Sequence, residues 1–270
     1  MAYNLLKGKR GIVFGALDDS SIAWKVAEKC HEEGAKFVLT NAALAMKMGE
    51  INKLAAKTDS EIIPADATSV EEIENLFEQA EKILGGKIDF ILHSIGMSPN
   101  IRKKKPYEDL NYSWYMKSMD VSALSFHKIM SVAYKKDHMN AGGSILALSY
   151  IAAQRVFPDY TDMAQAKACL ESIGRSFGYV FAKKNGVRVN TISQSPTVTT
   201  AGKGIKGFNA FIDFAEKMSP LGNADADDCA NYCVSLFSDF TKKVTMQNLM
   251  HDGGFSSTGI TADIIEQMEK

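Results

Sequence analysis

The fold is decided by the stretch Gly11-Ile-Val-Phe-Gly-Ala-Leu-Asp-Asp-Ser-Ser-Ile-Ala-Trp-Lys-Val-Ala-Glu-Lys-Cys-His-Glu-Glu-Gly34, which is followed closely by Phe37-Val-Leu-Thr40. Residues 11–14 form a short apolar run that ends at Gly15, and residues 22–33 carry apolar side chains at helical spacing until Gly34. A second short apolar run follows at 37–40. Strand, loop, helix and strand in this order form a βαβ unit, which requires parallel strands.

The same alternation continues along the chain. Further strand-like runs occupy residues 62–67, 88–92, 144–148, 187–193 and 246–250, and helix-like runs occupy 69–84, 111–136, 164–180, 225–237 and 261–270. We therefore predict one Rossmann-like α/β domain, 1–270, with a doubly wound parallel sheet of seven strands and helices on both faces. The Gly/Thr/Lys-rich loop at 194–207 and the helix-like run at 208–218 are expected to form a small helical lid (194–218) after strand six.

The composition limits the class of function. Hydrophobic residues make up 46% of the 270 residues, so the chain can bury a substantial core, and a formal net charge of -1 argues against general attraction to nucleic acid or membranes. The N-terminus lacks a signal-peptide core, and no apolar run approaches the roughly 18 residues that span a bilayer. We expect a cytoplasmic protein. The four cysteines are Cys30, Cys169, Cys229 and Cys233. They lack clustered His or Cys partners, so we expect reduced thiols in the core and no metal site.

A second stretch carries residues suited to chemistry: Tyr150-Ile-Ala-Ala-Gln-Arg-Val-Phe-Pro-Asp-Tyr160-Thr-Asp-Met-Ala-Gln-Ala-Lys167. It follows the run 144–148, bends at Pro158 and leads into the helix-like run 164–180. Lys167 is seven residues after Tyr160, which on a helix places both side chains on one face, about 10 Å apart along the axis. This separation suits a proton-donating phenol and a cation with a ligand held between them.

Small residues follow other predicted strands, at the edge where open α/β sheets bind ligands. The loop after Phe14 contains a single glycine, Gly15, and leads to a helix N-terminus that can bind a pyrophosphate. Gly and Ser are equally typical of a structural βα turn. Ser94-Ile95-Gly96 lets the backbone approach a ligand, and Asp66 can bond an adenine amino group or cap a turn. His93 is interpreted as a packed histidine, because no nucleophile lies near it in the sequence.

These features resemble the short-chain dehydrogenase/reductase superfamily along nearly the whole chain, down to His251-Asp-Gly-Gly254. Ordinary members carry Tyr-x-x-x-Lys with a Ser thirteen residues before the Tyr, whereas Ala164 and Ala147 occupy those positions here. The departures resemble a divergent branch, the enoyl-[acyl-carrier-protein] reductases of type II fatty acid synthesis. The matching motifs are Tyr150-x9-Tyr160-x6-Lys167, Gly15-x5-Ser21-Ile22-Ala23, His93-Ser-Ile-Gly96 and Gly204-Ile-Lys-Gly-Phe208.

The resemblance implies a reaction and three catalytic residues. Hydride would pass from nicotinamide to the β-carbon of a trans-2-enoyl thioester, and Tyr160 would bond the enolate oxygen. Lys167 would hold the nicotinamide ribose and favour an ionised or strongly polarised phenol. Tyr150 would line the acyl pocket or aid enolate protonation.

The resemblance also implies the binding residues. The cofactor would be held by Gly15, Ser21, Ile22, Ala42, Asp66, Ala67, Ser94, Ile95, Gly96, Lys167, Thr197, Val198, Thr199, Thr200 and Ala201. The substrate would meet Met97, Ser98, Tyr150, Tyr160 and Phe208. Ser195-Pro-Thr-Val198 stands where many relatives have Gly-Pro-Ile-Arg, so a phosphate-binding Arg is absent from this loop. Lys203 and Lys206 could attract an acidic carrier protein or be solvated loop lysines.

The cofactor and the alternatives complete the predictions. Asn41-Ala42-Ala43-Leu44 offers neither an acid for a ribose 2′-hydroxyl nor an immediate cation for a 2′-phosphate, although Lys47 could fold back. We predict NADH, with NADPH as the alternative, an acyl carrier protein bearing an enoyl chain as partner, and a homotetramer. The competing functions are an ordinary carbonyl or 3-ketoacyl reductase and a non-catalytic dinucleotide sensor.

Overall fold

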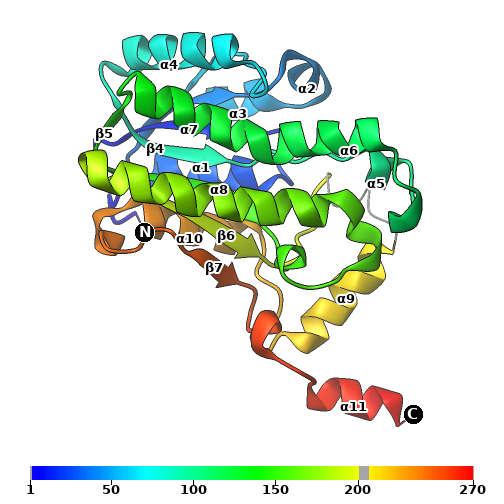
Figure 1. Cartoon of the computed structure of the whole chain (residues 1–270). Helices are drawn as coiled ribbons and strands as arrows, with labels where there is room; N and C mark the ends of the chain where they lie inside the picture. Colours follow the sequence, from blue (N-terminus) through cyan, green and yellow to red (C-terminus); the bar gives the residue numbers. More distant parts are fainter. Residues whose placement is uncertain (1, 201–206, 270) are drawn as a thin grey trace.

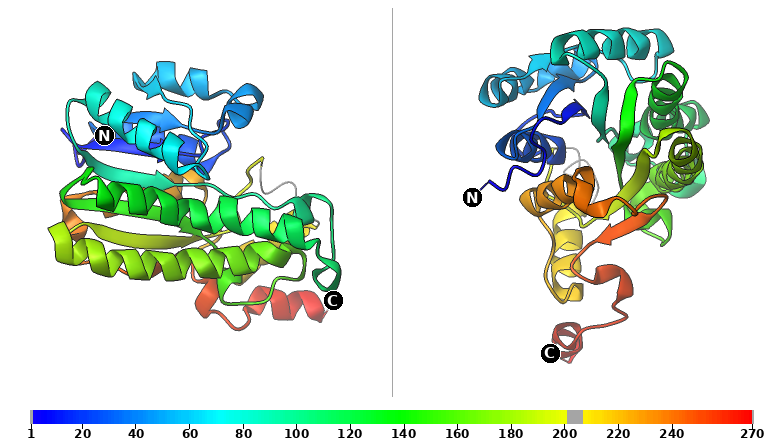
Figure 2. Two further views of the ribbon diagram at one scale, coloured as in Figure 1. Left: turned by 45° about the horizontal axis from the view of Figure 1, so that its top comes forward. Right: turned by 90° about the vertical axis from the view of Figure 1, so that its left-hand side faces the viewer.

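All seven strands lie in one parallel sheet, in the order β3-β2-β1-β4-β5-β6-β7 (Figures 1 and 2). The computed structural model describes residues 2–200 and 207–269, without the side chain of residue 208. The strands are β1 (Arg10–Phe14), β2 (Lys36–Thr40), β3 (Glu61–Ile62), β4 (Ile88–His93), β5 (Met139–Ser149), β6 (Arg188–Gln194) and β7 (Asn248–His251). Every strand pair is parallel. The predicted doubly wound sheet is confirmed.

Helices cover both faces of the sheet. One face packs against α1 (Ile22–Glu32), α3 (Ile51–Thr58) and α10 (Ala226–Phe237), and the other against α4 (Val70–Leu84), α7 (Ser125–Lys135) and α8 (Thr161–Asn185). Neighbouring strand residues alternate between these two cores: Ile145 and Ala147 face the second, and Leu146 and Leu148 the first. This alternation follows from the two-residue period of a strand buried on both faces.

The remaining helices surround the carboxyl ends of the strands. They are α2 (Ala43–Met48), α5 (Pro99–Arg102), α6 (Tyr112–Met119), α9 (Phe208–Met218) and α11 (Ala262–Met268). Figure 1 shows the arrowheads of β6 and β7 directed toward the side where α9 lies. The C-terminal helix is tied to α9, since Thr261 donates to the Lys217 carbonyl (2.8 Å) and Lys217 to Gln267 (2.8 Å).

Several predicted boundaries differ from the structure. The third strand is only Glu61–Ile62, so Asp66 lies in a turn beyond it. The predicted helix 111–136 is divided by a π-helical segment, Asp120–Leu124, between α6 and α7. The helices at 43–48 and 51–58 were not predicted. Among the helices in the described ranges, none is long and apolar enough to cross a membrane.

Candidate active site

The first βα loop and the end of β4 meet at Gly15. Gly15 has φ +93°, and a Cβ there would lie 2.0 Å from the Ser94 carbonyl oxygen. Only glycine allows this approach. The Gly15 amide donates to the Thr40 carbonyl (3.1 Å) at the end of β2. The fold therefore brings two predicted cofactor-binding residues, Gly15 and Ser94, together at the carboxyl edge of the sheet.

The serines of this loop bond within the loop and do not cap α1. Ser21 is the N-cap residue, but its hydroxyl donates to the Asp18 carbonyl (2.7 Å) and accepts from the Leu17 amide (3.3 Å). Ser20 donates to Asp18 Oδ1 (2.6 Å). Ile22 begins α1 with a half-buried side chain. Because no side chain in the described part of the chain caps α1, the amides of its first turn suit an anion.

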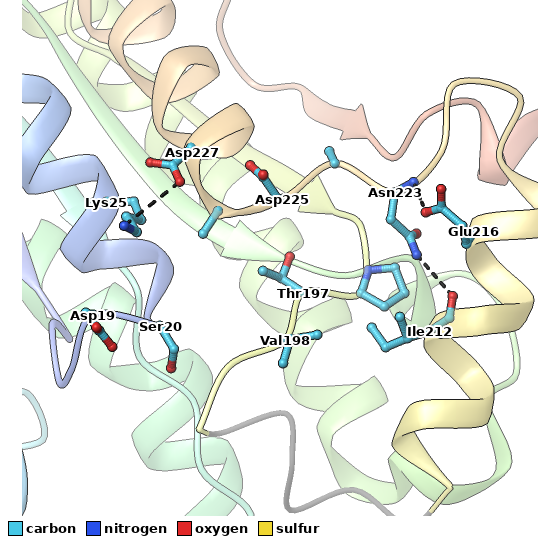
Figure 3. A pocket seen from close by; sticks show the side chains of 13 residues that line it. Asp19, Ser20, Lys25, Thr197, Val198, Ile212, Glu216, Asn223, Asp225 and Asp227 are labelled. Carbon is cyan, nitrogen blue, oxygen red and sulfur yellow. Dashed lines mark hydrogen bonds and ion pairs between the residues drawn. The ribbon is translucent and has the colours of Figure 1, made fainter.

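The segment after β6 approaches the same loop. A cavity of about 290 Å³ lies between them, with Ser20 on one side and Thr197 and Val198 on the other (Figure 3). Beyond Val198, Thr200 donates to Asp18 Oδ2 (2.7 Å) and its amide to the Ser20 hydroxyl (3.3 Å). Thr199 is half-buried, whereas Val198 is exposed. Thr197, Val198 and Thr200 thus lie beside the first loop; Ala201, Lys203 and Lys206 lie outside the described residues.

Lys167 is buried in the second turn of α8. Its ammonium group donates to the Leu148 carbonyl (2.6 Å), which holds α8 against the end of β5. A Cβ on Gly96 would lie 3.9 Å from Lys167 Nζ, so the predicted nicotinamide-side loop passes directly over this cation. Burial lowers the pKa of Lys167 to about 8, although the Glu171 carboxylate one turn further along α8 opposes the shift.

The two tyrosines form an aromatic pair. The ring centroids of Tyr150 and Tyr160 are 5.0 Å apart, and Tyr150 also contacts Phe157 (5.3 Å) and Phe211 of α9 (6.3 Å). Burial raises the pKa of both phenols, and the Tyr160 phenol adds to the shift at Tyr150. In the ligand-free protein Tyr160 is therefore protonated at neutral pH and can donate a hydrogen bond; an ionised or strongly polarised phenol in the complex stays a prediction.

The prediction that Tyr160 and Lys167 lie on one helix is wrong. Tyr160 is the last residue of a short 3-10 turn, Pro158–Tyr160, and α8 begins at Thr161. Thr161 has φ +31° and ψ -126°, so the chain turns sharply between the tyrosine and the helix. The tyrosine direction is set by this turn and by its aromatic neighbours, and not by helical periodicity.

The predicted adenine-side residues lie beyond β2 and β3. Ala42 is the N-cap residue of α2, and the Ala67 side chain is buried in the core. Asp66 is exposed, and its Oδ1 accepts from the Thr68 amide (2.8 Å) and the Thr68 hydroxyl (2.7 Å). The hydrogen bonds of this turn therefore use one carboxylate oxygen of Asp66.

The predicted substrate mouth is held by side chains that the sequence reasoning did not identify. Ser122 of the π-helical segment accepts from the Met97 amide (3.0 Å) and donates to the Met97 carbonyl (3.2 Å). The next residue, Ser98, is buried and donates to Asp162 Oδ1 (2.6 Å), so its hydroxyl faces the protein. Half-buried Ile95 packs against the core that contains α7. Of Phe208, only the backbone position at the start of α9 is described.

His93 is a packed histidine, as predicted. It is fully buried, hydrogen-bonds to Ser125 through Nε2 (2.8 Å) and packs against Phe126 (5.1 Å). Burial, with the nearby Lys167 charge, lowers its pKa to about 3. The histidine is therefore neutral at physiological pH. The three buried serines Ser118, Ser122 and Ser125 recur at spacings of four and three, which is a helical signal that could have revealed this polar stripe.

Unpartnered hydroxyls at strand ends fit a bound dinucleotide. Thr40 Oγ1 at the end of β2, Ser193 Oγ near the end of β6 and Tyr150 Oη after β5 are buried and have no hydrogen-bond partner among the described residues. Buried polar atoms are normally satisfied, so such atoms at a ligand edge indicate a missing partner. Across the same described ranges, no group of three or more His, Cys, Asp or Glu side chains is placed to hold a metal ion.

Comparison with known proteins agrees with this geometry. Residues 15–256 match the family described as Enoyl-(Acyl carrier protein) reductase. The chain is 34% identical over 97% of its length to an enoyl-[acyl-carrier-protein] reductase [NADH] of Rhizobium meliloti, with 95% of that protein covered. For the corresponding protein of Escherichia coli the identity is 32%, with 93% of this chain and 95% of that protein covered.

A solved structure is more similar still. The crystal structure of the FabI–NADH complex of Alistipes finegoldii shares 61% identity with this chain, with a TM-score of 0.95, and the match covers 96% of this chain and 92% of that one. Both the sheet and the motifs around Gly15, Tyr160 and Lys167 therefore have one explanation. The chain belongs to the enoyl-[acyl-carrier-protein] reductase family.

Proposed function

We propose that this chain reduces the trans-2 double bond of enoyl thioesters on acyl carrier protein, using NADH, in the last reductive step of each fatty acid elongation cycle. The observation that carries the proposal is the Tyr150–Tyr160 ring pair together with the buried Lys167 that Gly96 overlies. The relatives named above are NADH-dependent enoyl-[acyl-carrier-protein] reductases, and one is described as a complex with NADH.

Each residue of the site has a role in this reaction. Bound NADH supplies the hydride; the first turn of α1, Gly15, Lys167 and residues 197–200 would hold it. Tyr160 donates a hydrogen bond to the thioester oxygen as negative charge develops there, an interaction typically worth about 3 kcal/mol. Lys167 is mainly charged at pH 7 because its pKa is about 8, so it can donate to ribose hydroxyls. Tyr150 lines the acyl path beside Phe157 and Phe211.

The choice of NADH over NADPH rests on the relatives, because the segment beyond β2 does not separate the two cofactors. The first turn of α2 contains no acidic residue for a ribose 2′-hydroxyl, and Ala42 stands at its N-cap. Lys47, in the last turn of α2, is exposed. The relatives' names specify NADH. A protein that bound NADPH more tightly than NADH would contradict this choice.

We propose that residues 1–270 form one catalytic domain and that residues 194–218 form its lid. The carrier protein would deliver the enoyl chain to the mouth beside Met97, and the cytoplasm would be the site of the reaction. The long faces of α6–α7 and α8 suit subunit contact in a homotetramer, because Tyr112, Met116 and Tyr179 are exposed there. Sedimentation of the purified protein tests this assembly.

One assay separates the proposed function from its competitors. Oxidation of NADH and of NADPH is followed with crotonyl and acetoacetyl thioesters and with simple carbonyl compounds. We expect turnover with the crotonyl thioester and NADH. Turnover with the acetoacetyl thioester alone would indicate an ordinary ketoacyl reductase, although the buried Ala147 offers no hydroxyl for that chemistry. Tight cofactor binding without turnover of any substrate would indicate a sensor.

A further inference from the structure

A buried carboxylate lies two residues after the tyrosine that the proposed reaction uses. Asp162, in the first turn of α8, is fully buried. Its Oδ1 accepts from the hydroxyls of Ser98 (2.6 Å) and Thr161 (3.2 Å). Its Oδ2 accepts from the Ser118 hydroxyl (2.7 Å) and the Asn100 amide nitrogen (2.9 Å). Each carboxylate oxygen of Asp162 thus has two partners, and the Ser118 hydroxyl also lies 2.9 Å from the Trp114 carbonyl.

The donors come from three separate elements. Ser98 is the N-cap residue of α5 and accepts from the Ile101 amide (3.1 Å). Asn100 also accepts from the amide of Asn111, the N-cap residue of α6 (3.0 Å). Ser118 lies in the last turn of α6. Asp162 therefore joins the substrate mouth, α6 and the start of α8 through one carboxylate.

The same carboxylate borders the turn that orients Tyr160. Thr161, between Tyr160 and Asp162, has φ +31°, a strained conformation for a threonine that persists only where surrounding contacts hold it. Thr161 is buried, and its hydroxyl bonds to Asp162. Met97, immediately before Ser98, is held at both its amide and its carbonyl by Ser122. The Thr161 turn is thus held by Asp162, and the Met97–Ser98 segment is held by Asp162 and Ser122.

We propose that Asp162 is a positioning residue for Tyr160: by accepting four hydrogen bonds it holds the Thr161 turn and the Met97–Ser98 segment so that the phenol faces the thioester oxygen. This inference rests on the proposed function. It assigns no contact of Asp162 with substrate or cofactor. Replacing Asp162 by Asn puts an amide nitrogen, which donates, in place of one acceptor oxygen, so the hydroxyls that face it must turn to accept and their present bonds to Asp162 are lost.

The test is a double-mutant cycle with Tyr160→Phe. We expect Asp162→Asn to lower kcat on crotonyl thioester by about 10–100-fold, the loss typical of a displaced catalytic group, while the Kd for NADH changes less than about twofold. In the Tyr160→Phe background the further loss should be under about threefold, because residues that act through one another are not additive. A full additional loss in that background, or a parallel loss of NADH affinity, would overturn the proposal.

Two further variants serve as controls. Glu33→Gln is the matched control: Glu33 is also a buried carboxylate, bonded to the amides of Tyr3 (3.0 Å) and Leu5 (3.1 Å), but it lies at the opposite end of β1 from Gly15. An equal loss of kcat in Glu33→Gln would make the Asp162 effect a general consequence of instability. If Asp162→Asn does not fold, Ser118→Ala removes a single donor and should reproduce a smaller loss in kcat with the same dependence on Tyr160. Inactive wild-type protein would refute the proposed function, whereas active wild type with unaffected variants refutes only the positioning role.

Discussion

Replacing Lys167 by Met should stabilise the ligand-free protein near neutral pH. Lys167 is buried, and its pKa falls from the ordinary value of 10.5 to about 8, chiefly through burial. Since one pKa unit is worth about 1.4 kcal/mol, keeping this ammonium charged in the fold costs about 3 kcal/mol. Loss of the hydrogen bond from this charged donor to the Leu148 carbonyl costs about 2 kcal/mol. The free energy of unfolding should therefore rise by about 1 kcal/mol at pH 7.

The difference between the two proteins should depend on pH in a defined direction. Between pH 8 and pH 10.5 the unfolded wild-type chain binds more protons at Lys167 than the folded protein does, so wild-type stability gains from rising pH. Lys167→Met lacks this gain. Its advantage should shrink above pH 8 and reach zero at about pH 9, where the remaining cost of the charge equals the lost hydrogen bond, about 2 kcal/mol.

The assay is urea unfolding of both proteins without NADH at pH 7 and pH 10. Lys57→Met is the control, because Lys57 is exposed and solvent weakens its ion pair with Glu28 (2.7 Å). A separate titration should show about 10–100-fold weaker NADH binding in Lys167→Met, since bonds from a charged donor are worth about 1.5–3 kcal/mol. A variant that is less stable than wild type at pH 7, or a stability difference that is the same at both pH values, would refute the reasoning.

Three further perturbations follow from the site. Tyr160→Phe should lower kcat about 100-fold by removing the donor to the developing charge, with little change in NADH affinity; equal losses in steady-state kinetics and in an NADH titration would contradict the assigned role. Gly15→Ala should lower the free energy of unfolding by about 3 kcal/mol and abolish NADH binding, because its Cβ would lie 2.0 Å from the Ser94 carbonyl oxygen. Gly85→Ala is the control: Gly85 has φ +75° but no atom within 4 Å of an added Cβ, so this variant should lose only about 1 kcal/mol in the same denaturation. Tyr150→Phe should leave the ligand-free protein as stable or up to about 1 kcal/mol more stable, because it removes a buried hydroxyl without a partner; a loss of stability in urea would show that the hydroxyl is satisfied.

Local patterns in the sequence were sufficient for the architecture. The run 11–14, Gly15 and the helix 22–32 form a βαβ unit because their side-chain periods and turn residues act over short distances. The predicted helix at 208–218 coincides with α9, since its apolar spacing is a local property. The predicted strand 62–67 extends well beyond β3. The length of this edge strand depends on its pairing with β2, which the apolar run does not encode.

The sequence by itself determined the family, through the spacing of Tyr150, Tyr160 and Lys167 and the alanine at position 147. Only the tertiary structure decided the electrostatic state of these groups. Burial by residues distant in the chain keeps Tyr160 protonated and brings the pKa of Lys167 to about 8. Asp162 stands in the same motif, yet its role appears only when Ser98, Asn100 and Ser118 converge on it from other elements. Spacing along the chain records which side chains are present, whereas desolvation and hydrogen-bond partners depend on which distant segments pack around them.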